Sequence, residues 1–160
     1  MDSTLSAFCY WLQNRSFALN ISGSTWIFPW VQLLHYTGIG MWVGTSLLMD
    51  LRIMGLIKPI KTVGKFTRGL LVFNWTALAI GVTGGILLFS ANALTYLHNA
   101  AFRVKFPLLV FGILYHGFLQ GKALKAKNEF SMPSIFKTAA FAEILIWVAV
   151  VTAATRIPNQ

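Results

Sequence analysis

Long stretches of this sequence carry no formal charge. None lies between Arg15 and Asp50, and none lies between Arg68 and Arg103. A membrane helix needs roughly 20 predominantly apolar residues to cross about 30 Å of hydrocarbon, so both stretches are long enough to span a bilayer. The chain is 56% hydrophobic and 11% charged, whereas soluble domains carry about one quarter charged residues. We therefore expect an all-α integral membrane protein.

Four spans account for the apolar stretches, with polar or basic segments between them. We place the spans at residues 26–49, 69–90, 102–121 and 137–156. This arrangement predicts a single transmembrane domain over residues 1–160, folded as a four-helix bundle.

The segment before the first span, about residues 3–18, has a helical pattern of its own. Leu5, Phe8 and Leu12 share one helical face. Because the segment lacks a basic start, a signal peptide is disfavoured, and we expect a short amphipathic helix in the membrane interface. Ser24 or Thr25 is available to cap the first span.

The basic residues gather in the first and third connections between the spans. Nine of the thirteen lie there: Arg52, Lys58, Lys61, Lys65, Arg68, Lys122, Lys125, Lys127 and Lys137. Because lysine and arginine accumulate in cytoplasmic loops, we expect a multi-pass protein of the bacterial inner (plasma) membrane with both termini in the periplasm. The net charge of +9 is then a topology signal, and the expected partner is the lipid bilayer rather than nucleic acid.

Several kinds of chemistry lack the residues they need. Cys9 is the only cysteine, which excludes a disulfide scaffold and a Cys-x-x-Cys-His site for covalently attached haem. The sequence shows no Ser/His/Asp set, phosphate-binding loop or paired-carboxylate motif, so hydrolytic and phosphoryl-transfer chemistry have no support.

Two histidines lie inside the predicted spans, where ionisable groups are costly and usually functional. His35 lies roughly 13 Å into the first span, and His116 lies roughly 16 Å beyond Lys105 in the third, at 1.5 Å per residue. Imidazole is a standard axial ligand of haem iron. Similar depth on two helices therefore predicts a single haem b with His35 and His116 as its metal ligands.

Glycines near these histidines have two interpretations. Gly38 is three residues from His35 and Gly112 is four residues from His116, so each shares its histidine's face and would clear space for a macrocycle. Alternatively, they belong to the small-residue patterns that let membrane helices approach closely. Three such patterns occur, at residues 40–44, 81–85 and 117–121.

Basic residues near the outer ends of the spans would hold the haem propionates. The candidates for this role are Lys105, Arg103 and Arg156, with His98 nearby in the outer connection. His98 is otherwise expected to be a surface residue.

Other intramembrane polar residues suggest further roles. Glu143 in the fourth span would relay protons or contact a quinone head group; alternatively, it bonds Asn74 or Gln120 and is purely structural. Thioethers suit Cu(I), but Met41 and Met49 do not share a face with His35 at repeating helical spacing.

Several motifs resemble those of a family of small bacterial four-span membrane proteins of unknown function (DUF6644-like). They begin with the residues 24–29, Ser-Thr-Trp-Ile-Phe-Pro, and 34–38, Leu-His-Tyr-Thr-Gly. They continue with 50–55, Asp-Leu-Arg-Ile-Met-Gly, 83–89, Thr-Gly-Gly-Ile-Leu-Leu-Phe, and 99–105, Asn-Ala-Ala-Phe-Arg-Val-Lys.

The resemblance extends through His116 and covers most of the chain. It implies a four-helix membrane bundle with His35 and His116 at the family's two histidine positions, and a distant similarity to copper-resistance D-type and b-type cytochrome membrane proteins. Phe106-Pro107 departs from the expected pattern of two plain apolar residues. The family supplies no activity.

These observations lead to one main functional hypothesis and two alternatives. The main hypothesis is a membrane haem b protein, an electron-transfer subunit between a periplasmic redox partner and the quinone pool; if it is an enzyme at all, it is an oxidoreductase subunit. The first alternative is a non-redox accessory or scaffolding subunit of a larger membrane complex. The second is a copper or small-solute permease, which would require a homo-oligomer.

Overall fold

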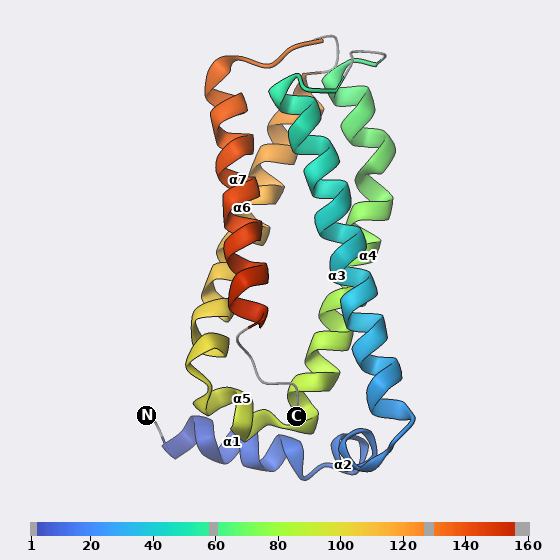
Figure 1. Ribbon diagram of the computed structural model, residues 1–160, viewed down its shortest axis with the longest axis vertical. Coiled ribbons are helices and arrows are strands. Elements are labelled where there is room, and N and C mark those ends of the chain that lie inside the picture. The colour runs from blue at the N-terminus through green and yellow to red at the C-terminus, as the bar shows by residue number, and fades with distance from the viewer. Residues whose placement is uncertain (1–2, 58–60, 127–129, 156–160) are drawn as a thin grey trace.

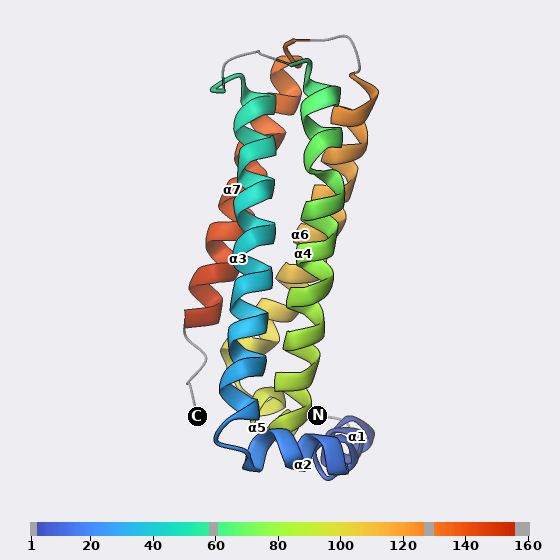
Figure 2. The ribbon, with the colours of Figure 1, turned by 90° about the vertical axis from the view of Figure 1, so that its right-hand side faces the viewer.

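The computed structural model describes residues 3–57, 61–126 and 130–155, and every regular element in these ranges is a helix. Four long helices run alternately in opposite directions and lie side by side (Figures 1 and 2): α3 (Ile27–Met54), α4 (Val63–Ala91), α6 (Ala100–Lys125) and α7 (Ser134–Thr155). Shorter helices lie at one end of this bundle: α1 (Ser3–Gln13), α2 (Ser16–Gly23) and α5 (Ala93–His98). We call this the short-helix end. The opposite end, where α3 connects to α4 and α6 to α7, is the basic end.

Helices α4, α6 and α7 are each long and apolar enough to cross a membrane. Helix α3 has 28 residues but does not reach the same apolarity, because a row of polar side chains follows its length. The buried members of that row are Thr45, Ser46, Asp50 and Arg52.

The outward faces of the bundle are apolar. Val72 is 78% exposed, Leu114 68% and Ile86 62%. Large apolar side chains at this exposure need a hydrocarbon environment, since leaving them in water costs about 25 cal/mol for each Å² of apolar surface. Together with three apolar helices of spanning length, this surface identifies a multi-pass membrane protein with the lipid bilayer as its partner.

The long helices overlap the four predicted spans and extend beyond them at the basic end. Helix α3 continues past residue 49 to Met54, and α4 begins at Val63 rather than at residue 69. The added residues include Arg52 and Lys65. Charges mark where a chain leaves hydrocarbon, but they do not end a helix, so the hydropathy pattern predicts shorter elements than the backbone forms.

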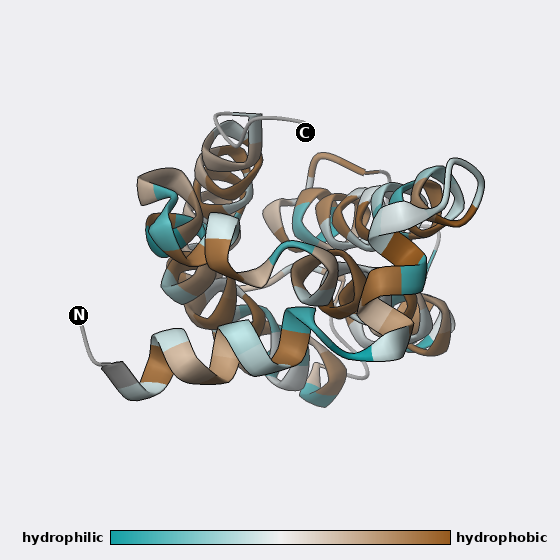
Figure 3. Ribbon diagram, turned by 90° about the horizontal axis from the view of Figure 1, so that it is seen from below, coloured by the Kyte–Doolittle hydropathy of each residue, from teal (hydrophilic) through white to brown (hydrophobic). Residues whose placement is uncertain are grey.

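The N-terminal segment forms two helices, although a single helix over residues 3–18 is the sequence expectation. Helix α1 ends at Gln13, and the Arg15 guanidinium lies 3.9 Å from the centre of the Trp11 ring. Figure 3, which views the molecule from the short-helix end, shows α1 lying across the end of the bundle. The Ser24 hydroxyl accepts hydrogen bonds from the Trp26 N–H at 3.3 Å and the Ile27 N–H at 3.0 Å, although the residue at the N-cap position of α3 is Trp26.

The inner face of α1 is fixed to α5. Cys9 is buried in a cluster with Ala93 and Leu97, and the Gln13 side-chain oxygen accepts a hydrogen bond from the Leu94 N–H at 3.1 Å. Burial raises the pKa of the Cys9 thiol, which makes it a poor nucleophile.

Candidate functional site

His116 lies at the centre of the bundle, with 1% of its surface exposed, and it contacts all three other long helices. Its Nδ1 is hydrogen-bonded to Oε1 of Glu143 on α7. Its Nε2 lies 3.0 Å from Oδ1 of Asn74 on α4 and 3.4 Å from Oγ of Ser46 on α3. A polar side chain from each helix therefore meets at this one ring.

Glu143 joins this ring to a second carboxyl group. Its Oε1 also accepts a hydrogen bond from Nε1 of Trp147 at 3.0 Å, and its carboxyl faces that of Asp50 on α3. Both acids are at most 1% exposed. Two carboxylates in contact in an apolar interior repel each other unless a proton lies between them. We call Asp50, Glu143 and His116 the acid–imidazole cluster.

Two side-chain amides lie close to Nε2 of His116. A hydrogen bond at the other end of each amide fixes its orientation. The Asn74 amide nitrogen donates to Oγ1 of Thr45 at 2.8 Å, which leaves Oδ1 facing the ring. The Gln120 amide oxygen accepts from Nε1 of Trp75 at 2.9 Å, which leaves its nitrogen 2.7 Å from Nε2. The ring thus meets one acceptor and one donor at the same nitrogen.

This pairing suits more than one protonation form of the imidazole. A protonated Nε2 donates to Oδ1 of Asn74, and an unprotonated Nε2 accepts from the amide nitrogen of Gln120. When Nε2 is protonated, its N–H faces the Gln120 amide nitrogen 2.7 Å away, so this form requires the Gln120 amide to shift toward its other acceptors, Sδ of Met49 and Oδ1 of Asn74.

Indole rings enclose the cluster. The Trp42 ring lies edge-on to His116 with the ring centres 5.8 Å apart, and Trp147 packs against Trp42 at 4.4 Å. The Trp75 ring lies 6.2 Å from His116. Hydrogen bonds in such a water-poor interior are stronger than in water.

The structure does not bring His35 and His116 to one level, and their joint ligation of a haem stays a prediction. Nδ1 of His35 donates to the Gly81 carbonyl at 2.7 Å, whereas His116 meets Asn74. Gly81 and Asn74 are seven residues apart on α4, about 10 Å along its axis. The depth of His116 was counted from Lys105, but α6 begins five residues earlier, at Ala100.

Other parts of the protein occupy the space beside the two glycines that were expected to make room for a haem. A Cβ on Gly38 would lie 2.4 Å from the Gly81 nitrogen, and a Cβ on Gly112 would lie 2.7 Å from the Trp147 ring. Gly38 therefore serves the contact between α3 and α4, and Gly112 makes room for an indole. Helix packing, the second interpretation, is the one that the structure supports.

Among the small-residue patterns, the α4 pattern makes the close contacts. Gly81 meets Ile39, and Gly85 meets the His35 ring at 3.1 Å. Gly40 and Gly44 on α3 have no neighbour within 4 Å of a Cβ position. The pattern at residues 40–44 is therefore not a packing site among the residues that the structure describes.

The basic residues predicted to hold haem propionates lie in different environments. Lys105 is half-buried, whereas Arg103 is exposed. Arg156 lies outside the described residues. His98 is exposed, as expected, and its Nδ1 donates to the Leu94 carbonyl at 2.8 Å.

The structure gives the methionines separate environments. Met41 is 44% exposed, while Sδ of Met49 is buried and lies 3.1 Å from the Gln120 amide nitrogen. In the described part of the chain, no three His, Cys, Asp or Glu side chains are placed to hold a metal ion. The acids and His116 instead bond to one another.

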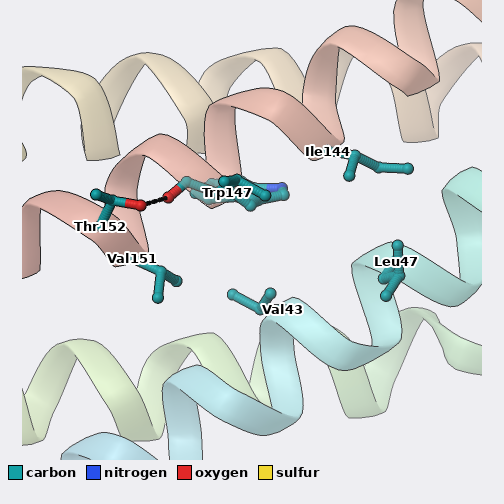
Figure 4. A pocket seen from close by; sticks show the side chains of 7 residues that line it. Val43, Leu47, Ile144, Trp147, Val151 and Thr152 are labelled. Carbon is teal, nitrogen blue, oxygen red and sulfur yellow. Dashed lines mark hydrogen bonds between the residues drawn. The ribbon is translucent and has the colours of Figure 1, made fainter. Parts of the chain in front are cut away.

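A groove of about 240 Å³ lies between α3 and α7, on the outside of the cluster (Figure 4). Its lining is apolar except for Thr152, whose hydroxyl donates to the Val148 carbonyl. Trp147 contributes to the groove and also donates to Glu143. The groove therefore offers no polar contact for a quinone head group in the described residues.

Comparison with known proteins agrees with the motifs in the sequence. A model described as "Family of unknown function (DUF6644)" matches residues 16–158. The chain belongs to this family. The match starts at the first residue of α2 and includes every long helix. No curated protein and no solved structure matches the chain.

In this member of the family, the sequence indicates some site residues and misses others. His116, Glu143, Asn74 and Gln120 stand out as polar residues within apolar spans. Asp50 does not, because it lies just beyond the end of the first predicted span, where a charged residue is expected. One signal for it exists: Ser46 and Asp50 are four residues apart and share one helical face.

Proposed function

We propose that this chain is a membrane protein that binds and exchanges a proton in the core of a four-span bundle, as a subunit of a proton-coupled membrane process. The observation that carries this proposal is the continuous contact from Asp50 through Glu143 to His116, across three helices and with at most 1% of any of these residues exposed. Ionisable groups in this position are costly and are kept for function.

The proton has three connected positions. It is shared between the Asp50 and Glu143 carboxyls, and it passes from Oε1 of Glu143 to Nδ1 of His116 along their hydrogen bond. The imidazolium that forms donates its Nε2–H to Asn74. Because Asn74 accepts from a protonated Nε2 and Gln120 donates to an unprotonated one, a change of protonation requires movement of the Gln120 amide alone, which suits a proton relay.

The surroundings of the cluster contain few competing charges. Helix α4 contributes Asn74 and Thr67 to this side, neither of which titrates. Nη2 of Arg52 donates to the carbonyls of Lys61 and Phe130, and Tyr115 donates to the Ala139 carbonyl.

The proposal includes the topology. Helix α3 is the fourth span, because it runs beside α4 over its whole length (Figure 2) and its polar row faces the interior. The basic end faces the cytoplasm of the bacterial inner membrane, and the short-helix end faces the periplasm, by the positive-inside rule.

The protonated carboxyl gives the direct test. The chain has only four acidic side chains, Asp2, Asp50, Glu129 and Glu143, so infrared difference spectra of the protein in lipid nanodiscs are simple. We expect a protonated-carboxyl C=O band at neutral pH that disappears in Asp50→Asn and responds to pH.

Glu129→Gln is the matched control for that experiment and should leave the band unchanged. In His116→Gln the band should shift, because Glu143 loses its imidazole partner. A wild-type protein with no protonated carboxyl at neutral pH, or one whose band is constant over all accessible pH, would refute proton exchange.

A haem on His35 is the second candidate function, with electron transfer between a periplasmic partner and the quinone pool as its role. The observation in its favour is the 2.7 Å hydrogen bond from Nδ1 to the Gly81 carbonyl. This bond fixes the tautomer and leaves the Nε2 lone pair free, as in metal-binding histidines. His35 would be one axial ligand, and the haem would supply one-electron chemistry.

Absorbance spectra test this candidate and separate it from paired ligation. In a haem-replete preparation, His35→Ala is expected to abolish a Soret band, while His116→Ala leaves it in place because that ring is bonded to Glu143 and Asn74. Loss of the band in both variants would instead support the paired-histidine hypothesis. A wild-type protein without a Soret band would exclude both.

A further inference from the structure

Buried polar groups are distributed unequally along the bundle. From the acid–imidazole cluster to the basic end they include Asp50, Arg52, Thr62 and Thr67. On the other side of the cluster, all four long helices contribute to an apolar layer, whose buried members are Trp42, Ala77, Leu78, Trp147 and Val150. The two sides of the site therefore differ: toward the basic end, buried polar groups lie among apolar residues such as Ile53, Val63 and Leu119, whereas the layer toward the short-helix end is apolar.

Several atoms on the side toward the basic end have no hydrogen-bond partner among the described residues. They are Nε of Arg52 and the hydroxyls of Thr62 and Thr67, together with Oδ2 of Asp50 and Oε2 of Glu143 when no proton lies between the two carboxyls. Buried polar atoms in native proteins are paired with protein or with ordered water, and an unpaired one costs about 1–3 kcal/mol. A row of such atoms is what a chain of internal water requires, because each water needs 2–4 polar partners.

Thr67 is the key member of this row. It is 1% exposed and lies seven residues from Asn74 on α4, two helical turns along the same face and about 10 Å nearer the basic end. The contact of Ser46 with Asn74 fixes the register of α3 against α4. In that register Thr67 lies between the level of Asp50 and the end of the bundle.

The opposite side is closed by side chains. Trp42 and Trp147 are 0% and 4% exposed, and Leu78 lies between the level of Asn74 and the short-helix end. One unpaired donor, Nε1 of Trp42, occurs in this layer, but it is not part of a row. His35 and Lys105 lie beyond the layer, and no hydrogen bond within the described part of the chain connects them to the cluster.

We propose that the acid–imidazole cluster exchanges its proton with water at the basic end alone, along a hydrated path past Thr67 and Asp50. This inference rests on the proposed function, since it specifies the access route of the same site. Under the positive-inside expectation the route opens to the cytoplasm, and the apolar layer isolates the cluster from the periplasmic side.

Thiol labelling in membrane vesicles tests the route. In a Cys9→Ala background, single cysteines are introduced on α4 as T67C, L78C and K65C, and a membrane-impermeant, water-soluble maleimide is added to one side. Thr67 and Leu78 lie on the same helical face, eleven residues apart, and both are buried, while Lys65 is exposed. K65C reports which vesicles present the basic end.

We expect T67C to be labelled in the vesicles in which K65C is labelled, and L78C to stay unlabelled from either side. An unlabelled T67C beside a labelled K65C would overturn the route, as would labelling of L78C from the short-helix side. These variants need only report water access, so they do not depend on the proton chemistry itself.

Proton kinetics give the second test. T67V removes the hydroxyl but keeps the shape, so after a pH jump we expect slower protonation of the carboxyl pair with the same end point. T152V, on an exposed threonine of α7, is the control and should change neither. If the carboxyl band titrates normally but T67V and wild type exchange at equal rates, the route is wrong while the proposed function stands. If no carboxyl titrates, the proposed function itself fails.

Discussion

Replacing Glu143 with alanine is expected to lower the free energy of unfolding by about 3–5 kcal/mol, the range for removing one member of a buried hydrogen-bonded ion pair. The carboxyl is 0% exposed and bonds to His116 and Trp147. Its removal leaves Nδ1 of His116 and Nε1 of Trp147 without their protein acceptor. The measurement is the unfolding free energy in mixed detergent micelles with increasing denaturing detergent.

Glu143→Gln is the matched variant. Its amide oxygen still accepts from Trp147 and its size is unchanged, so it should lose clearly less stability than the alanine variant while abolishing proton transfer. Thr152→Ala on the exposed face of α7 should have little effect. Equal stability of wild type, Glu143→Ala and Glu143→Gln would mean that the carboxyl is not part of a buried network.

The membrane-spanning character of the chain is predictable because it depends on length and apolarity alone. A run of about 20 apolar residues has few alternatives to a spanning helix, and the predicted ranges overlap α3, α4, α6 and α7. The ends are less predictable. A basic side chain such as Arg52 or Lys65 can lie inside a helix that has already left the hydrocarbon, so charge alone does not mark the last residue.

The rotation of each helix about its axis could not be predicted, and this decides the site. In soluble proteins, the boundary between apolar and polar faces shows which side is buried. In this chain the lipid-facing side and the core-facing side are both apolar. The sequence thus identifies His116 and Glu143 as intramembrane residues but does not indicate that they face each other, or that His35 faces the Gly81 carbonyl instead of His116.

The depth of His116 along its helix could not be counted from the sequence, for a related reason. Lys105 marks a plausible membrane surface, yet it is half-buried and lies in the second turn of α6. Long basic side chains reach an interface from positions well inside a helix. A count that starts at such a residue underestimates how deep His116 lies.

Gly38→Ala is expected to destabilise the bundle by about 3 kcal/mol or more, at or above the top of the usual range for overpacking. A Cβ at this position would lie 2.4 Å from the nitrogen and 2.7 Å from the Cα of Gly81. The obstacle is backbone, so no rotamer change relieves it, and α3 and α4 must separate. Separation would also strain the hydrogen bond from Nδ1 of His35 to the Gly81 carbonyl.

Gly40→Ala on the same helix is the control that separates the steric overlap at Gly38 from the change in helix propensity. Gly40 has no neighbour within 4 Å of a Cβ position, and alanine is favoured over glycine in helices by up to about 1 kcal/mol, so this variant should be neutral or slightly more stable than wild type. Unfolding free energies of Gly38→Ala and Gly40→Ala under identical conditions provide the comparison. Equal values would show that α3 and α4 do not meet at Gly38 and Gly81. The level of His35 on α4 would then be wrong, and paired ligation by His35 and His116 would again be a geometric possibility.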